Sequence, residues 1–327
     1  MVFEWPKTLG TILAATVNYV ASYFHIWGWR MSLGGGGIPT FLLLLVSFTL
    51  IETPQFFIEQ DHLERAKKIL QSLRGSNTEV EFTGSDIELE FTELVVDTKK
   101  KQTMEALREI IRPCNRPILV ISSIETVFGK LSGGDLFIFY GPFLLQSIGY
   151  ERHWSFLAAL VVAFVDTIAK GVSPLLIRRI GRRRVYLVAY LTAIIPLVCV
   201  GSLFHLNLNT HHHFIPHRAT TTIVFVLLHI IGSGVISGPD GWLHSTFPPE
   251  CEDLASAYKI CLERLTTFTV NQIFFHVLCA VREWTFFLYA GLCLAMMLFN
   301  VWFIPETTGI AQHAIARRVW SQHWFWK

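Results

Sequence analysis

The sequence predicts an all-α, multispanning membrane protein with about eight transmembrane helices and a helical cytoplasmic loop. Of its 327 residues, 52% are hydrophobic and only 16% are charged. A soluble domain usually carries about 25% charged residues, and the mean hydropathy here is +0.44. Apolar segments of about 20 residues, the length that crosses a bilayer as a helix, recur along the chain.

Eight segments are long and apolar enough to be predicted as spans. They are residues 8–27, 33–51, 117–148, 154–177, 185–205, 220–243, 256–281 and 284–304. The first is the weakest, because threonine, asparagine and serine interrupt it.

Lysine and arginine are concentrated on one side of the predicted spans. The loop between the second and third spans is rich in both, and Arg178–Arg184 lies between the fourth and fifth. Connections on the other side hold mostly single basic residues. Since basic loops stay cytoplasmic and eight is even, we expect both termini in the cytoplasm.

The loop between residues 53 and 112 contains three short apolar stripes at helical spacing. They consist of Leu63, Ala66, Leu70 and Leu73, of Phe91, Leu94 and Val95, and of Met104, Leu107 and Ile111. Gly75 follows the first stripe, Ser85 and Glu88 form a capping-box pattern before the second, and Pro113 closes the third. We expect short amphipathic helices on the cytoplasmic face; the alternative is a solvated charged linker.

The stretch from Gly129 to Pro142 interrupts the third predicted span with glycines, a proline, Lys130 and Asp135. Irregular or ionisable groups at membrane depth usually face protein or a water-filled cavity. Broken helices of this kind line substrate sites in secondary transporters. The alternative is a kinked span with charges near its ends.

Motifs along nearly the whole chain resemble, in order, the sugar porters of the major facilitator superfamily, most closely the plant monosaccharide/proton symporters. The matching stretches are Trp27–Leu33 with Glu52–Pro54, Gly129–Pro142, Arg178–Arg183, Ser237–Leu243 with Phe247–Glu250, Pro305–Gly309 and His323–Lys327. The resemblance implies a partial major facilitator fold.

Four regions follow from this resemblance. Residues 1–52 correspond to family helices five and six, 53–112 to the cytoplasmic helical loop, 113–306 to the six-helix C-terminal half and 307–327 to a cytoplasmic tail. Helices one to four have no counterpart, so the chain is expected to be N-terminally truncated.

In the family, amide side chains and a tryptophan bind the sugar. Neutral amides both donate and accept hydrogen bonds, as sugar hydroxyls do, without burying a charge. By position, the resemblance places this site on Trp242, Gly129, Lys130, Asp135, Asp166, Glu263 and, more loosely, Glu4. Only Trp242 keeps the family's residue type.

The departures replace amides by charges or glycine. A charge at the membrane centre costs about 2.5–3.5 kcal/mol unless it is paired or hydrated. Asp166 and Lys170, at i and i+4, are expected to pair on one helix face, and Lys130 to pair with Asp166 or Glu263. Such pairs would hold a sugar poorly; the alternative is drift in a copy no longer selected for transport.

The resemblance also predicts a cytoplasmic gate. Its residues are Arg179, Gly181, Arg182, Arg183, Glu52 and Glu306. Arg178 replaces the family's acidic residue at the start of this loop, which removes a charge partner.

The resemblance implies a plasma-membrane hexose transporter of the proton-symporter type, with impaired or no transport as this chain. The alternative is a non-transporting membrane protein that associates with full-length homologues. The proton is the expected coupling ion, but its family site lies on helices one and four. We expect no enzyme activity, nucleic-acid binding or cofactor. We also expect no metal site, since the neighbouring side chains of His211, His212 and His213 project in different directions.

Overall fold

The computed structural model describes residues 4–24, 26–50, 52–74, 91–92, 95, 108, 110–112, 115–147, 149–210, 216–237, 247 and 252–304. Within these residues the regular secondary structure is helical. The predicted all-α class is confirmed.

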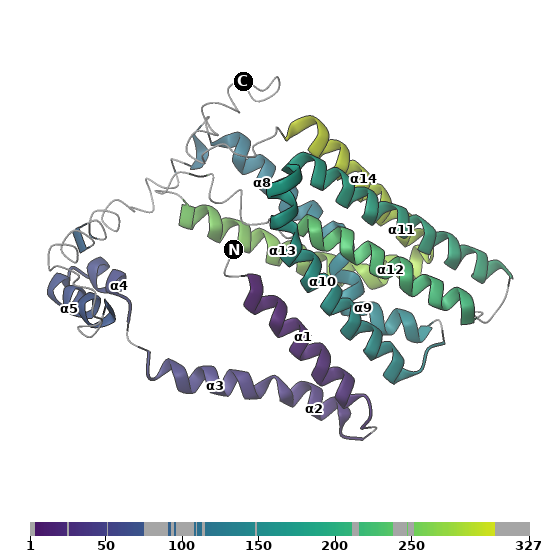
Figure 1. Ribbon diagram of the computed structural model, residues 1–327, viewed down its shortest axis with the longest axis horizontal. Helices are drawn as coiled ribbons and strands as arrows, with labels where there is room; N and C mark the ends of the chain where they lie inside the picture. The colour runs from purple at the N-terminus through teal and green to yellow at the C-terminus, as the bar shows by residue number, and fades with distance from the viewer. Residues whose placement is uncertain are drawn as a thin grey trace.

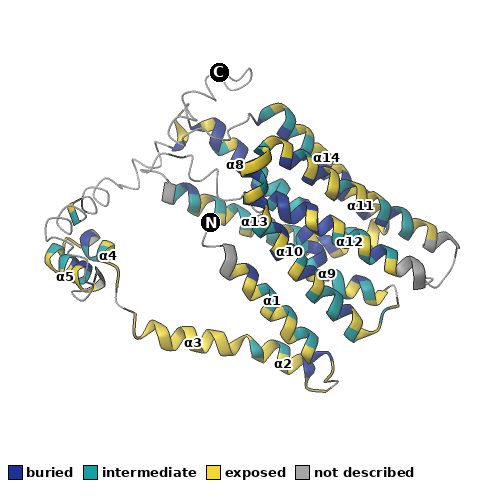
Figure 2. Ribbon diagram, viewed as in Figure 1, coloured by how far each residue is buried: buried dark blue, intermediate teal, exposed yellow. Residues whose placement is uncertain are grey.

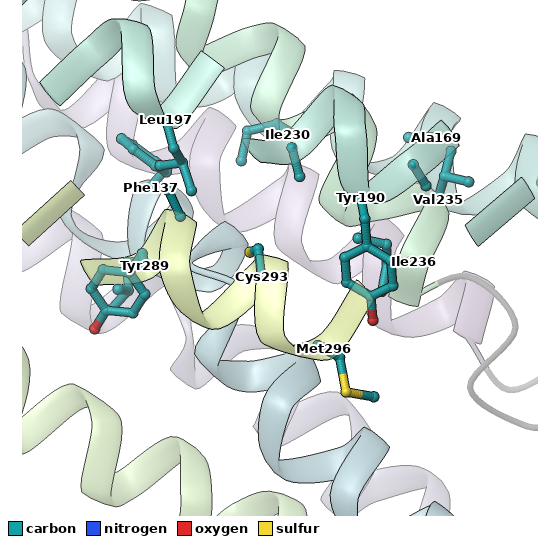
Figure 3. Packing of buried hydrophobic residues seen from close by; sticks show 14 of the residues in the cluster. Phe137, Ala169, Tyr190, Leu197, Ile230, Val235, Ile236, Tyr289, Cys293 and Met296 are labelled. Carbon is teal, nitrogen blue, oxygen red and sulfur yellow. The ribbon is translucent and has the colours of Figure 1, made fainter. Parts of the chain in front are cut away.

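Within the described part of the chain, seven helices form the main bundle (Figure 1). They are α8 (Arg116–Leu131), α9 (Gly134–Ser147), α10 (Arg152–Ile180), α11 (Arg182–Thr210), α12 (Pro216–Ser237), α13 (Glu252–Val281) and α14 (Trp284–Phe303). Helix α11 packs against α12 and α14, α10 against α9 and α12, and α13 against α8. The apolar core between them includes Phe137, Leu197, Ile230 and Cys293 (Figure 3).

Three further helices extend from the bundle at the N-terminal end. They are α1 (Glu4–Ala21), α2 (Gly28–Gly35) and α3 (Gly37–Ser47). Helix α1 packs against α10 and α2, whereas α3 has no buried residue, as its colouring in Figure 2 shows. Its apolar side chains include Phe41 and Leu43, which are 59% and 69% exposed. This exposed apolar surface suits lipid or another membrane helix.

Five stretches of the described chain are long and apolar enough to cross a membrane, compared with eight expected. They are Gly28–Ser47, Arg152–Ile180, Arg182–Leu206, Thr220–Ser237 and Trp284–Phe303. The other three predicted segments are also helical. The third is divided into α8 and α9, each shorter than 18 residues, and polar residues interrupt α1 and α13.

Two short helices begin the predicted cytoplasmic loop: α4 (Pro54–Glu59) and α5 (Leu63–Arg74), which pack against each other. The side chain of Thr53 caps α4 by accepting a hydrogen bond from the Phe56 N–H at 3.4 Å. Ala66 and Leu70 are buried, as expected for the first apolar stripe.

The third apolar stripe is placed differently. Ile110 is buried and Ile111 is 57% exposed, so the buried face includes the residue before the predicted one. Ser85, Glu88, Leu94, Met104 and Leu107 lie outside the described residues.

Candidate substrate site

The third predicted span is broken between α8 and α9, as the Gly129–Pro142 stretch indicated. Gly133 lies at the break with φ +89°, a conformation that glycine adopts without a steric penalty. At Gly134, a Cβ atom would lie 2.8 Å from the Ser233 Cβ of α12. The absence of a side chain therefore lets α9 start directly against α12.

A buried histidine lies beside this break. His229 of α12 is fully buried, and its Nδ1 lies 3.0 Å from the backbone oxygen of Ala193. Its ring packs edge-on against Phe137, with centroids 5.3 Å apart. Nε2 has no hydrogen-bond partner among the described residues. His229 was not among the residues predicted from the sequence, although a lone histidine inside an apolar run was a detectable signal.

Lys130 connects three helices near the break. Its Nζ lies 3.0 Å from Oδ2 of Asp135 at the start of α9 and 3.2 Å from Oε1 of Glu263 on α13. The same Glu263 oxygen lies 3.7 Å from the Nζ of Lys7 on α1. Of the two partners considered for Lys130, Glu263 is the one in contact.

Asp166 and Lys170 form the expected i, i+4 ion pair on α10. The distance between Lys170 Nζ and Asp166 Oδ2 is 2.6 Å. The Asp166 side chain is 7% exposed and that of Lys170 is 22% exposed. The pair therefore neutralises a buried carboxylate within a single helix.

Part of the predicted set lines one cavity. Gly129, Lys130 and Glu263 face an opening between α8, α11, α12, α13 and α14, whose empty space is about 470 Å³ including the part open to solvent. Glu4 lies in the first turn of α1, but its side chain is outside the described residues, as is all of Trp242. The structure thus brings Lys130, Asp135 and Glu263 together. Asp166 is paired with Lys170 and is not among the residues that line this cavity.

The predicted gate residues are distributed between two places. Gly181 separates α10 from α11 with φ +95°, Arg179 lies in the last turn of α10, and Arg182 begins α11. Arg183 donates a hydrogen bond from Nη2 to the backbone oxygen of Val301 in α14 at 2.8 Å.

Glu52 is exposed and lies between α3 and α4; in Figure 1 these two helices stand apart from α14. Glu306 lies outside the described residues. The described structure therefore brings Arg183 to α14 without bringing Glu52 to the arginines.

Sequence comparison identifies the family of this bundle. The family model described as "Sugar (and other) transporter" matches residues 1–318. The chain belongs to this sugar transporter family. Membership agrees with the resemblance found in the motifs and with the broken helix beside the cavity.

Several plant members of the sugar transporter family are similar over the whole chain. Sugar transport protein 6 of Arabidopsis thaliana is 32% identical over 330 residues, which cover 100% of this chain and 64% of that protein. Sugar transport protein MST4 of Oryza sativa subsp. japonica is 30% identical, with 100% and 63% covered. The chain thus spans a little less than two thirds of these relatives' length.

Solved structures confirm the fold. A partially occluded, inward-open structure of the xylose transporter XylE from E. coli matches with a TM-score of 0.70 at 17% identity, covering 94% of this chain and 63% of that one. A structure of the major facilitator superfamily proton:xylose symporter XylE, bound to 6-bromo-6-deoxy-D-glucose, matches with a TM-score of 0.65 at 17% identity, covering 93% and 63%. The partial major facilitator fold expected from the sequence is confirmed.

Proposed function

We propose that this chain is a plasma-membrane protein of the monosaccharide/proton symporter type whose binding of neutral hexoses is impaired. Its similarity to plant sugar transport proteins supports monosaccharide as the substrate class, and its likeness to the proton:xylose symporter XylE supports the proton as coupling ion. The observation that carries the impairment is the contact of Lys130 with both Asp135 and Glu263.

The impairment follows from the chemistry of hydroxyl recognition. A sugar hydroxyl both donates and accepts hydrogen bonds. It therefore needs protein groups that are not already held by stronger contacts. Here the ammonium of Lys130 is engaged by two carboxylates, and Asp166 is engaged by Lys170. Charge-assisted contacts are about twice as strong as neutral hydrogen bonds, so a neutral hexose cannot replace them without a net loss.

An uptake assay tests this proposal. The whole chain is produced in cells lacking their own hexose uptake, and labelled glucose is measured with and without an uncoupler. We expect no saturable uptake. Purified protein carrying Lys130→Gln, Asp135→Asn, Asp166→Asn and Glu263→Asn together should bind glucose more tightly than the unchanged chain.

Lys68→Gln is the matched control, because Lys68 is exposed on α5, a helix that contributes no residue to the cavity lining. Saturable, uncoupler-sensitive glucose uptake by the unchanged chain would contradict the proposal. Equal glucose binding by the unchanged and amide-bearing proteins would contradict the stated cause.

A second candidate function is association with full-length homologues without transport. The outward-facing apolar side chains of α3 favour it, since they offer an uncovered helix face. Co-purification of a tagged chain with a full-length relative, reduced by Leu43→Ser but not by Lys68→Ser, would support it. Recovery of chaperones alone would exclude it. In either case, we expect both termini on the cytoplasmic side.

A further inference from the structure

Exposed aromatic rings gather where the connection between α1 and α2 meets the start of α10. The ring centroids of Tyr23, on this connection, and His153, on α10, are 6.1 Å apart. His153 in turn lies 5.0 Å from the ring of Trp154. Both Tyr23 and Trp154 are exposed. This end of the structure therefore presents a group of large aromatic side chains on its surface.

Arg30 of α2 contacts two further aromatic rings at this end. Its Cζ atom is 4.9 Å from the ring centroid of Trp27 and 4.7 Å from that of Trp29. Cation–π contacts of this length attract the guanidinium group to the faces of the indole rings. The N–H donors of a guanidinium group lie at the edge of its plane, so these contacts leave donors available for an acceptor.

Arg30 forms no ion pair with a carboxylate of the described residues. At the same end, Glu151 contacts His153 instead, with 3.5 Å between Oε2 and Nδ1. Arg30 is exposed, and so are Trp27 and Trp29, at 63% and 55%. Within the described chain, the positive charge of Arg30 therefore has aromatic neighbours and an open side, but no anionic partner.

This group of side chains lies where two candidate membrane spans begin. The spans Gly28–Ser47 and Arg152–Ile180 both start at this end. Helix α3, which completes the first of them, is exposed along its whole length (Figure 2). Tryptophan and tyrosine are enriched at the level of the lipid headgroups. Arg30, in the first turn of its span, is therefore expected at that level.

We propose that Arg30, together with Trp27 and Trp29, binds the phosphate group of a membrane phospholipid. The guanidinium edge donates paired hydrogen bonds to two phosphate oxygens, and the indole rings hold the guanidinium in place. A lipid is the occupant that this position favours, because the positive charge lies at headgroup level and adjoins the exposed apolar side chains of α3. This lipid site is independent of hexose transport and of the cavity beside α8.

Lipid retention by the whole chain tests the proposal. The chain in a non-ionic detergent is titrated with phosphatidylglycerol, phosphatidylcholine and diacylglycerol of identical acyl chains, and bound lipid is counted by native mass spectrometry. Diacylglycerol lacks the phosphate, and phosphatidylcholine carries a compensating positive charge. We expect phosphatidylglycerol to bind most tightly, about fivefold more tightly than diacylglycerol.

Variants at this end assign the retained lipid to Arg30. Arg30→Gln should weaken phosphatidylglycerol binding about fivefold, the effect of one basic residue close to an anionic lipid, and should leave diacylglycerol binding unchanged. Arg30→Lys should restore only part of the loss, because an ammonium group lacks the paired donors. Replacing both Trp27 and Trp29 by leucine should weaken binding about threefold.

Arg184→Gln is the matched control. Arg184 is also an exposed arginine in the first turn of a membrane span, but within the described chain no aromatic ring lies over it as over Arg30. We expect this variant to retain phosphatidylglycerol as the unchanged chain does.

Four results would overturn the proposal. They are equal binding of phosphatidylglycerol and diacylglycerol, equal losses for Arg30→Gln and Arg184→Gln, and displacement of the lipid by inorganic phosphate at matched concentration, which would indicate a site for free anions. The fourth is a crosslink from position 30 to another protein with no lipid retained, which would identify a protein interface.

Discussion

Lys130 of α8 reaches Glu263 of α13, with 3.2 Å between Nζ and Oε1. The same Nζ reaches Asp135 on the far side of the α8–α9 break, 3.0 Å away. One ammonium group thus holds three helix segments together where the backbone of the span is interrupted. Because the side chains of Lys130 and Glu263 are only 19% and 17% exposed, the stability of this region should depend on the contact.

Replacing Lys130 by methionine is expected to destabilise the protein. The substitution leaves two poorly exposed carboxylates without their shared ammonium group. Breaking a fully buried pair costs about 3–5 kcal/mol; partial exposure here reduces the expected loss to about 2 kcal/mol. Thermal unfolding in detergent, with Lys68→Met as control, measures it. Equal unfolding midpoints for the two variants would refute the expectation.

The pair energy itself can be isolated with a double-mutant cycle. Lys130→Met and Glu263→Met together should lose less stability than the sum of the single losses, by about 1 kcal/mol or more, since residues in contact are coupled. The measurement is the same detergent unfolding applied to the four proteins of the cycle. Strict additivity would mean that the 3.2 Å contact contributes no coupling energy.

Replacing either partner of the Asp166–Lys170 pair should lower the stability of the protein, but by different amounts. Lys170→Met leaves the carboxylate of Asp166, whose side chain is 7% exposed, without its ammonium partner. Asp166→Asn leaves Lys170, at 22% exposure, with a long chain able to move its ammonium group toward water. We expect Lys170→Met to lose about 1 kcal/mol more stability than Asp166→Asn. The reverse order in unfolding experiments would show that the lysine, and not the acid, is the costly partner.

Contacts within one helix were predictable, whereas contacts between helices were not. The i, i+4 spacing brings Asp166 and Lys170 together on any α-helix. Spacing alone left Lys130 with two possible partners, because helix packing decides between them. Its contact with Asp135 depends on how the chain turns at Gly133, and the contact of Lys7 with Glu263 depends on where α1 lies.

For the fold as well, features set within one segment were predictable, whereas features set by packing between helices were not. Apolar length predicted a helix at each of the eight segments. The Gly129–Pro142 stretch indicated a break in the third segment but not its exact position, since the end of α8 and the start of α9 depend on the close approach of Gly134 to Ser233. His229 was visible as a lone histidine in the apolar run of α12, but its contacts with Ala193 and Phe137 depend on how α12 packs against other helices.

Replacing each of two glycines of α9 by alanine should change the stability of the protein in opposite directions. Gly141 lines an apolar cavity, and a Cβ atom there would have no neighbour within 4 Å. Gly141→Ala is therefore expected to stabilise the protein by about 0.5–1 kcal/mol, because alanine favours the helical state. At Gly134, the added Cβ would lie 2.8 Å from Ser233 Cβ, and the expected loss is about 1–3 kcal/mol.

Detergent unfolding of both alanine variants provides the measurement, each protein serving as the matched control for the other. Destabilisation by Gly141→Ala would mean that flexibility at this position of α9, rather than space, requires glycine. No loss for Gly134→Ala would mean that α9 and α12 separate easily at the break.

The turn between α13 and α14 should give a pH-dependent contribution to stability. Oε1 of Glu283 lies 3.2 Å from Nδ1 of His205 on α11. A hydrogen bond from its own backbone N–H, followed by the contact with His205, holds the pKa of Glu283 below its usual range. A depressed carboxyl pKa contributes stability that is present above the unfolded value of about 4.3 and is lost as the pH falls through the folded value.

Glu283→Gln is therefore expected to lower the free energy of unfolding near neutral pH by at most about 1 kcal/mol, as for an ion pair near the surface. The difference from the unchanged chain should begin to shrink as the pH falls below the unfolded value of about 4.3. It should vanish below the folded value, where the carboxyl is protonated in both folded and unfolded states. Glu151→Gln is the control, because that side chain is 74% exposed. A stability difference for Glu283→Gln that stays constant from neutral to acidic pH would show that shape at the turn, rather than the charge of Glu283, stabilises the connection to α11.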